Sequence, residues 1–279
     1  MKIKMRRRIT KATKKIQAEG FLTFVRGVRE SPKKKTENAR RKVRDYLLEL
    51  HQGRIAYGPF KGMEIQVEQV SWGDGDLSAK ILGVYEKCVL DKIAELGETI
   101  EGPFIDIGAA DGYYVIGAVK AGLFREAHAF EIDPRGREAI LCNADVNGVS
   151  DKIFSHAEAD LAQLQSLITS HSNALVLIDI EGAEFDLLDV EMFEALRKCT
   201  IIVESHPRSI EEGNVYEQKM LERAAKHFTI EKLKGNFVSP NEFDELDGFS
   251  DFERLMAFSE GRAWAGYWFL MTPRRMISS

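Results

Sequence analysis

Apolar and polar residues alternate with two different periods along the chain, and the period predicts where helices and strands form. Residues 1–50 have helical spacing over Ile9 to Val28 and again over Glu37 to His51. The Ser31-Pro32 step and the lysine run Lys33 to Lys35 lie between these stretches, where we expect the helix to be interrupted. Residues 1–50 are therefore predicted to form a basic helical N-terminal arm.

Residues 51–100 predict a hairpin and then a helix that leads into the core. Arg54 to Tyr57 and Met63 to Val67 alternate on either side of the turn Gly58 to Gly62. Apolar positions from Ile81 to Leu96 then follow helical spacing. Between them, the glycine- and aspartate-rich segment Trp72 to Asp76 is predicted either as a lid over a ligand or as an ordinary turn.

Residues 101–279 alternate short apolar strands with helices, which is typical of an α/β fold with helices on both faces of a parallel sheet. The predicted strands are Phe104–Ile107, Ala127–Ile132, Lys152–His156, Ala174–Asp179, Thr200–Glu204, Phe228–Leu233 and Trp264–Met271. The predicted helices are Tyr113–Lys120, Pro134–Asp145, Glu184–Lys198 and Val215–His227. No helical crossover is evident in the irregular acidic segment 236–263, so we expect a Rossmann-like seven-stranded sheet whose last strand is antiparallel.

Composition is that of a globular protein, with 279 residues, 44% hydrophobic and 30% charged. No apolar stretch is long enough for a membrane span, and Met1 to Thr10 lacks the apolar part of a secretory signal. The three cysteines, Cys88, Cys142 and Cys199, are widely spaced. These features predict a cytoplasmic protein with reduced thiols.

The net charge of −5 hides a division between a basic arm and an acidic body. Residues 1–45 carry 17 Lys or Arg against 4 Asp or Glu, whereas the remaining residues carry 22 against 40. Such an arm could bind nucleic acid or a membrane surface, which would make the protein membrane-peripheral. The alternative is a solvated helical appendage that packs on the acidic body. The oligomeric state is not indicated.

The strongest chemical signal lies between Phe104 and Tyr114, where a buried strand ends in an acid, a glycine loop and a helix. Ligands of open α/β sheets bind beyond the carboxyl ends of the strands, and Gly108 allows close backbone approach. Ala110 replaces the second glycine of the dinucleotide fingerprint, and Asp106 and Asp111 would repel a pyrophosphate. A cationic ligand is therefore favoured over NAD. Glu131 ends the next strand, where an acid can accept hydrogen bonds from ribose hydroxyls.

These motifs resemble class I S-adenosylmethionine-dependent methyltransferases, over roughly residues 103–235. Leu177 to Phe185 resembles the Asp-x-Glu-Gly-x-Glu signature of the FkbM-type family, and Ile202 to His206 resembles its Glu-x-His segment. The resemblance implies S-adenosylmethionine as the cofactor. It also implies O-methylation of a hydroxyl on a sugar, a polysaccharide or a small metabolite.

Matching positions assigns residues to the cofactor and to catalysis. The expected cofactor-binding residues are Asp106, Gly108, Ala109, Asp111, Tyr113, Glu131, Ile132, Glu158 and Asp179. Glu158, or alternatively Asp160, would meet the adenine amino group, and Asn143 matches a family position without an assigned role. The candidate catalytic bases are His206, Asp179 and Glu181, with His206 favoured because its ordinary pKa lies near neutrality. Asp179, Glu181 and Glu204 could instead bind a divalent metal, although no metal site is favoured.

Three other interpretations stay open at this stage. The acceptor pocket could be lined by aromatic residues of the late segment, or these could be local core: Phe237, Phe243, Phe249, Phe252 and Phe258. The chain could be a nucleic-acid methyltransferase anchored by its arm, although it lacks an evident base-flipping motif. It could also be a non-catalytic binding protein that retains the fold. An NAD-dependent oxidoreductase is disfavoured by the loop chemistry.

Overall fold

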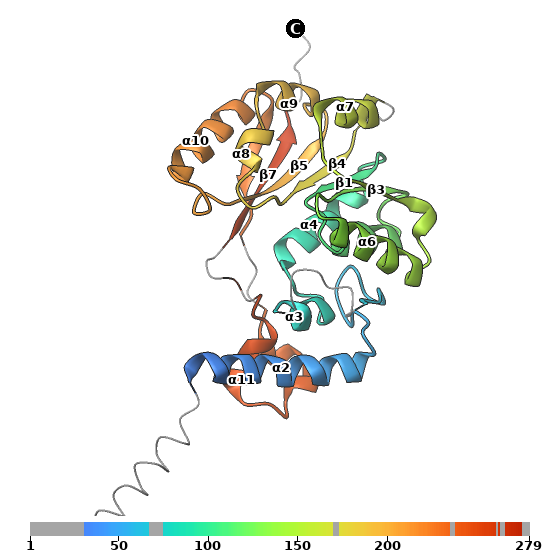
Figure 1. Cartoon of the computed structure of the whole chain (residues 1–279), viewed down its shortest axis with the longest axis vertical. Helices are drawn as coiled ribbons and strands as arrows, with labels where there is room; N and C mark the ends of the chain where they lie inside the picture. The colour runs from blue at the N-terminus through green and yellow to red at the C-terminus, as the bar shows by residue number, and fades with distance from the viewer. Residues whose placement is uncertain are drawn as a thin grey trace, which may run out of the picture.

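A seven-stranded sheet forms the centre of the computed structural model, which describes residues 31–66, 75–169, 173–234, 238–260, 262 and 266–274. The strand order is β3-β2-β1-β4-β5-β7-β6 (Figure 1). The strands are β1 (Phe104–Ile107), β2 (Ala127–Phe130), β3 (Ile153–His156), β4 (Leu175–Ile178), β5 (Thr200–Ser205), β6 (Phe228–Lys232) and β7 (Tyr267–Pro273). Strands β1 to β5 pair in parallel, while β7 is antiparallel to both β5 and β6. The predicted mostly parallel α/β sheet with an antiparallel last strand is confirmed.

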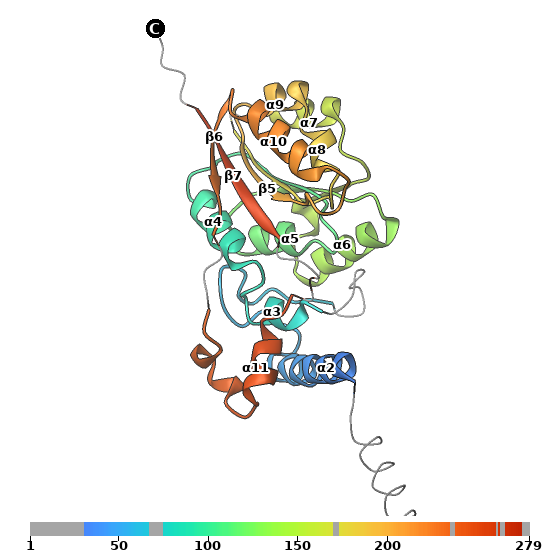
Figure 2. The same cartoon turned by 90° about the vertical axis from the view of Figure 1, so that its left-hand side faces the viewer.

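Helices cover both faces of this sheet, as Figure 2 shows. One face carries α4 (Lys87–Gly97), α5 (Tyr113–Lys120) and α6 (Pro134–Val146), and the other carries α7 (Leu161–Thr169), α8 (Glu184–Leu187), α9 (Val190–Ala195) and α10 (Gly213–Ala224). Alternate residues of one strand face the two helical layers, so that Phe104 packs in one apolar core and Ile105 in the other. Strands buried on both faces explain the unbroken apolar runs in the sequence.

Two predicted helices are wrong because each is split in two. The stretch from Ile81 to Leu96 contains α3 (Leu77–Ile81) and α4, separated at Gly83, where φ is +68°. A side chain at Gly83 would place its Cβ 2.0 Å from the Tyr57 carbonyl oxygen, so only glycine fits. The stretch from Glu184 contains α8 and α9, because Asp189 caps a new helix by accepting a hydrogen bond from Met192 N. Apolar periodicity continues through both breaks and therefore does not reveal them.

The predicted hairpin at residues 54–67 is reduced to one antiparallel bridge, between Arg54 and Glu64. Side chains of α6 satisfy the backbone that a longer hairpin would have paired. Asn147 accepts from Glu64 N at 2.9 Å and donates to Glu64 O at 2.8 Å, while Asn143 accepts from Gln66 N at 3.0 Å. Val67 and residues 72–74 of the predicted lid lie outside the described residues.

Helix α2 spans Pro32–His51 and begins earlier than predicted. Ser31 is its N-cap, since its hydroxyl accepts from Lys34 N, and Pro32 occupies the first turn, where its missing N–H costs nothing. The lysine run Lys33 to Lys35 is therefore part of a helix and does not interrupt one. The predicted helix Ile9 to Val28 lies outside the described residues.

The segment before β7 contains helix α11 (Asp251–Ala257) and two short 3₁₀ turns, at Pro240–Glu242 and Asp244–Leu246, and another 3₁₀ turn, Ser150–Lys152, precedes β3. Helix α11 packs against α2 beyond the end of the sheet that faces α3 (Figure 1). Lys42 Nζ lies 2.6 Å from Glu253 Oε1, and the rings of Tyr46 and Phe249 meet edge to face. Segment 236–263, which was predicted to be irregular, therefore contains a helix that packs against α2. Within the described residues, no helix is long and apolar enough to cross a membrane.

A substitution at Gly117 in α5 would test how tightly Phe60, in the segment 51–66, packs against this helix. A Cβ at Gly117 would lie 2.3 Å from the Phe60 ring. Although alanine is the better helix former, we expect Gly117→Ala to lower the free energy of unfolding by about 1–3 kcal/mol because of overpacking. Urea unfolding measures it, with Gly248→Ala as the control because nothing lies near that Cβ. A Gly117→Ala variant as stable as wild type would contradict this packing.

The Lys42–Glu253 pair predicts a pH dependence for the contact between α2 and α11. The hydrogen bond from Lys42, with those from Ser250, lowers the pKa of Glu253 to about 2. Because the folded pKa lies below the unfolded one, this contribution to stability is present above the ordinary value of 4.5 and is lost as the pH falls. Glu253→Gln should therefore be less stable than wild type at pH 6, and the difference should shrink towards pH 3. A difference in unfolding free energy that does not change with pH would count against the pair, and Glu37→Gln is the exposed control.

Candidate functional site

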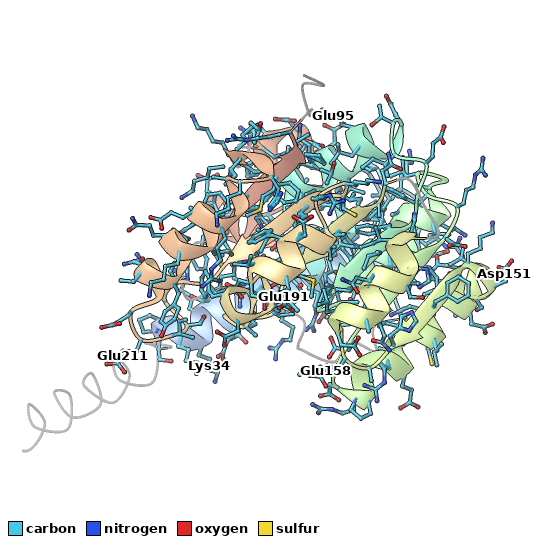
Figure 3. All side chains as sticks on the ribbon, turned by 90° about the horizontal axis from the view of Figure 1, so that it is seen from above. Lys34, Glu95, Asp151, Glu158, Glu191 and Glu211 are labelled. Carbon is cyan, nitrogen blue, oxygen red and sulfur yellow. The ribbon has the colours of Figure 1, made fainter. Side chains whose placement is uncertain are left out.

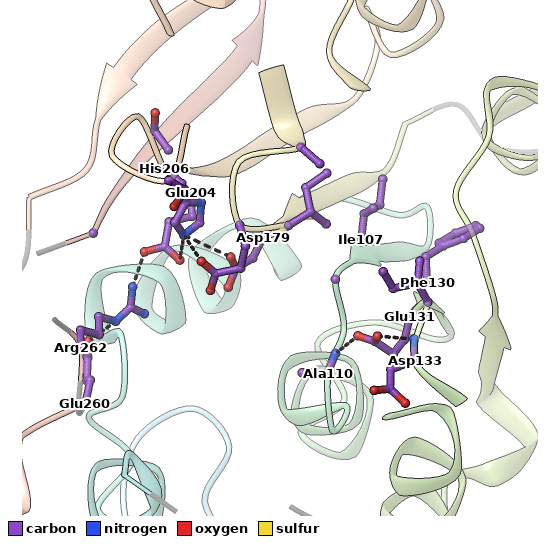
Figure 4. Close-up of a pocket in the computed structure, with 18 of the residues that line it drawn as sticks. Ile107, Ala110, Phe130, Glu131, Asp133, Asp179, Glu204, His206, Glu260 and Arg262 are labelled. Atoms are coloured by element: carbon purple, nitrogen blue, oxygen red, sulfur yellow. Dashed lines mark hydrogen bonds and ion pairs between the residues drawn. The ribbon is translucent and has the colours of Figure 1, made fainter. Parts of the chain in front are cut away.

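A cavity of about 1320 Å³ opens at the carboxyl ends of β1, β2, β4 and β5. This is the edge of a parallel sheet at which α/β proteins bind ligands. Its wall includes the segments that follow each of these strands, and Arg40 of α2, Glu260 and Arg262 also contribute. Figure 4 shows two groups of polar side chains in it, one around Glu131 and one around Asp179 and His206.

The segment after β1 passes very close to the segment after β4. Gly108 has φ +95°, and a Cβ there would lie 1.8 Å from the carbonyl oxygen of Asp179. Ala110 adopts φ 47°, in the left-handed region, before α5 begins at Tyr113. Gly108, Ala110 and Asp111 line the cavity wall, whereas Ala109 is buried behind it.

Two backbone N–H groups, one of them in the segment after β1, hold the Glu131 carboxylate in place. Its Oε2 accepts from Ala110 N at 2.9 Å and its Oε1 accepts from Asp133 N at 2.8 Å (Figure 4). The side chain lines the cavity although the residue is only 5% exposed. Beside it, Ile132 is 78% exposed, which is unusual for an isoleucine and presents apolar surface to the cavity. Glu158 lies on the same wall, while Asp160 is not among the lining residues described.

Asp106 and Tyr113 lie behind the cavity wall. Asp106 is 1% exposed, and neither of its carboxylate oxygens has a hydrogen-bond partner among the described residues. Burial, with the charges of Glu131 and Asp111, raises the pKa of Asp106 well above its usual range. Tyr113 is buried, and that burial raises its pKa. Neither Asp106 nor Tyr113 is among the residues that line the cavity.

His206 stands at the centre of a ring of carboxylates at the other end of the cavity. Its Nε2 lies 3.5 Å from Glu204 Oε2, 3.6 Å from Asp179 Oδ1 and 3.7 Å from Glu181 Oε2. Glu184, which is fully buried, accepts from His206 N at 2.7 Å and from Gly182 N at 2.7 Å. The Asp-x-Glu-Gly-x-Glu and Glu-x-His segments are therefore one structural unit.

The carboxylates determine the protonation of His206. Burial disfavours the charged imidazole, but the neighbouring carboxylates of Glu184, Glu204 and Asp179 raise its pKa to about 10. The prediction that an ordinary histidine pKa makes His206 the favoured base does not fit these surroundings. Burial and the charge of Glu204 also raise the pKa of Asp179, whereas an imidazole with a pKa near 10 already carries its proton at neutral pH and cannot take another.

Several charged residues of the site were missed from the sequence. Lys80 is 7% exposed and lies 3.3 Å from Asp111 and 3.1 Å from Asp76, so one acid of the β1 loop is already neutralised. Arg262 forms ion pairs with Glu86 and Glu204 and, at 2.9 Å, with Glu260. No local sequence pattern assigns these residues to the site, because the partners that place them there, Asp111 for Lys80 and Glu86 and Glu204 for Arg262, are distant along the chain.

Asn143, which had no assigned role, is a structural residue at the base of the loop. Its amide donates to Asp111 O at 3.0 Å and its oxygen accepts from Gln66 N. It therefore joins the β1 loop to residues 64–66.

Where they are described, the late aromatic residues are not among those that line the cavity, which favours the local-core alternative for them. Phe243 packs against Tyr57 and Phe258, and Phe249 packs against Tyr46 of α2. Phe252 lies under Lys35. These rings secure the contact between α2 and the late segment, which is the local-core alternative. Phe237 lies outside the described residues.

Comparison with known proteins finds similarity only at the level of solved structures. No family model and no curated protein matches the chain. A "putative O-methyltransferase" from Klebsiella pneumoniae is 13% identical with a TM-score of 0.45, covering 88% of this chain and 92% of that one. Geranyl diphosphate methyltransferase in complex with GPP and sinefungin is 13% identical with a TM-score of 0.44, covering 86% and 99%. An RNA methyltransferase from Salinibacter ruber in complex with S-adenosylhomocysteine is 23% identical with a TM-score of 0.32, covering 43% and 75%. Sequence identities and TM-scores this low do not show which reaction this chain performs.

The unpartnered carboxylate of Asp106 predicts that the site lowers the stability of the free protein. Because the pKa of Asp106 is raised in the folded state, wild type should lose stability as the pH rises above the ordinary value of about 4. Asp106→Asn does not titrate, so we expect it to be more stable than wild type by about 1 kcal/mol or more at pH 8 and by less at pH 5. Chemical unfolding at both pH values measures the difference. An Asn variant less stable than wild type at pH 8 would contradict the expected cost of this buried acid.

Proposed function

We propose that the chain is an S-adenosylmethionine-dependent methyltransferase that transfers a methyl group to a hydroxyl oxygen of a saccharide or another small molecule. The observation that carries the proposal is the single cavity that joins Glu131 and Ile132 to the Asp179–His206 cluster. A cofactor that extends from a nucleoside to a reactive methyl group needs such a pair of sites in one cavity.

The Glu131 end fits the nucleoside of the cofactor. The Glu131 carboxylate is fixed by two backbone N–H groups, and its remaining lone pairs can accept hydrogen bonds from two ribose hydroxyls. Ile132 would cover one face of the adenine ring, and Glu158 lies where a carboxylate can accept from the adenine amino group. Gly108 and Ala110 would border the methionine part. The acidic residues of this wall, Asp111, Glu131, Asp133 and Glu158, oppose a pyrophosphate, although Lys80 offsets part of that charge.

The Asp179–His206 end fits the chemistry of the acceptor. In the transfer, the acceptor oxygen attacks the methyl carbon in line with the carbon–sulfur bond, which breaks and leaves a neutral thioether. The hydroxyl proton must leave to a nearby group, and the carboxylates of Asp179 and Glu181, which lie with His206 within 4.8 Å of one another, are the groups that could take it. The joining of the two sequence motifs in one cluster supports membership of the FkbM-type family as part of the proposal.

The role of the arm stays a prediction. Residues 1–30 lie outside the described part of the chain, and α2 uses its apolar face and Lys42 to bind the late segment. Binding of nucleic acid or a membrane surface, and the cytoplasmic location, therefore rest on sequence alone.

Isothermal titration calorimetry tests the proposed cofactor. We expect one S-adenosylmethionine to bind per chain and NAD⁺ to give no saturable heat. Glu131→Gln should weaken S-adenosylmethionine binding by roughly 10- to 100-fold, because a hydrogen bond to a charged acceptor contributes about 1.5–3 kcal/mol. Release of S-adenosylhomocysteine in the presence of a panel of hydroxylated acceptors then tests the transfer itself.

Glu138→Gln is the matched control, since Glu138 is an exposed carboxylate on α6 outside the cavity. Its affinity for S-adenosylmethionine should equal that of wild type. Absence of S-adenosylmethionine binding by the folded wild-type protein would sink the proposed function, and equal loss in both variants would remove Glu131 from the site.

A further inference from the structure

We propose that His206, Asp179 and Glu181 form a binding site for one divalent transition-metal cation, with Glu204 beside them. The sequence alone favoured no metal site, because acids at strand ends are common. The positions of the side chains around a single nitrogen atom change that expectation.

The distances around His206 Nε2 match a coordination sphere better than a set of hydrogen bonds. Three carboxylate oxygens, from Asp179, Glu181 and Glu204, lie 3.5–3.7 Å from this one nitrogen. One N–H can point at only one of them, and all three distances exceed the usual 2.7–3.2 Å of an N–H···O bond. The ligand atoms of Asp179, Glu181 and His206 lie within 4.8 Å of one another, whereas ligands about 2.1 Å from a shared metal lie roughly 3.0–3.4 Å apart, so these three side chains would move inward to bind one cation.

The buried oxygens are a second, independent observation. Asp179 Oδ1 is enclosed and has no hydrogen-bond partner among the described residues, and it faces Nε2. Glu204 is 1% exposed, yet its Oε2 comes no closer to Nε2 than 3.5 Å. Buried carboxylates without full partners are costly, and a bound cation is one of the ways proteins compensate them. Arg262 neutralises the other oxygen of Glu204 and leaves Oε2 directed at the cluster.

The surroundings of His206 are those of a metal ligand. Its Nδ1 lies 3.4 Å from Glu184 Oε1, and Glu184 is itself fixed by the backbone N–H groups of His206 and Gly182. A carboxylate on the far nitrogen is the usual partner that orients a metal-bound imidazole. Glu181 has φ 54°, an uncommon conformation for a glutamate. Its side chain is 81% exposed, and its carboxylate is directed at His206 Nε2.

The donor set points to the class of cation. Carboxylates alone suit Mg²⁺ or Ca²⁺, whereas an imidazole nitrogen among carboxylates suits Mn²⁺, Fe²⁺ or Zn²⁺. The site lines the cavity, so one position of the cation can face a bound molecule. If the proposed function holds, that position would take the acceptor hydroxyl, because a cation makes bound hydroxyl groups more acidic. Metal binding itself does not depend on the proposed function.

Titration of the full-length protein with Mn²⁺ tests the site. The protein is first treated with a chelator and desalted, and free Mn²⁺ is then followed by electron paramagnetic resonance. We expect one Mn²⁺ per chain, with ¹⁴N modulation of the spin echo from the His206 imidazole. Glu181→Gln should weaken Mn²⁺ binding at least tenfold, and His206→Asn should remove both binding and the ¹⁴N modulation.

Two comparisons keep the test decisive. Glu181 is largely exposed, so Glu181→Gln should fold even if His206→Asn does not, and Glu211→Gln, an exposed carboxylate at the edge of the molecule (Figure 3), should bind Mn²⁺ like wild type. The proposal is overturned if Mn²⁺ shows no saturable binding below 1 mM, if Glu181→Gln binds as tightly as wild type, or if bound Mn²⁺ shows no ¹⁴N coupling. Calorimetry with S-adenosylmethionine is read separately, so a failure of the metal site and a failure of the cofactor site remain distinct.

Discussion

The site depends on how closely the backbone after β1 passes the backbone after β4. At Gly108 the two chains are so close that a Cβ would overlap the carbonyl oxygen of Asp179. Because β1 and β4 are adjacent and parallel, this contact fixes the distance between the loop that holds Glu131 and the cluster around His206. One cavity can therefore serve a nucleoside at one end and a proton acceptor or a metal at the other. Any side chain at position 108 would separate the two halves.

Charge is concentrated at this edge of the sheet at a cost to the free protein. Asp106, Asp179 and Glu204 lie at the ends of neighbouring strands, and burial together with nearby carboxylates raises the pKa values of Asp106 and Asp179. Lys80, Arg262 and His206 offset part of this charge from other elements. A cationic cofactor and a divalent cation would both reduce the remaining repulsion. The same acids thus lower stability in the free state and select positive ligands.

The sequence predicted the strands and the edge of the sheet that carries the site, because short runs buried on both faces and acids at their ends are local signals. Glu131, Asp179 and His206 were found in this way. The breaks at Gly83 and Asp189 were missed, since apolar spacing continues across both and the cause at Gly83 is a contact with Tyr57. The contact between α2 and α11, and the roles of Lys80, Arg262 and Asn143, depend on partners far along the chain. The same holds for the protonation of His206, which is determined by three carboxylates, of Glu184, Glu204 and Asp179, that only folding brings together.

A crystal structure of the protein with S-adenosylhomocysteine would test the central claim most directly. The account predicts the two ribose hydroxyls within hydrogen-bond distance of Glu131 and the adenine against Ile132. The sulfur should lie near Gly108, and the side of it that carries the methyl group in S-adenosylmethionine should be directed at Asp179 and His206. A ligand bound outside this cavity, or one whose sulfur faces away from the Asp179–His206 cluster, would contradict it.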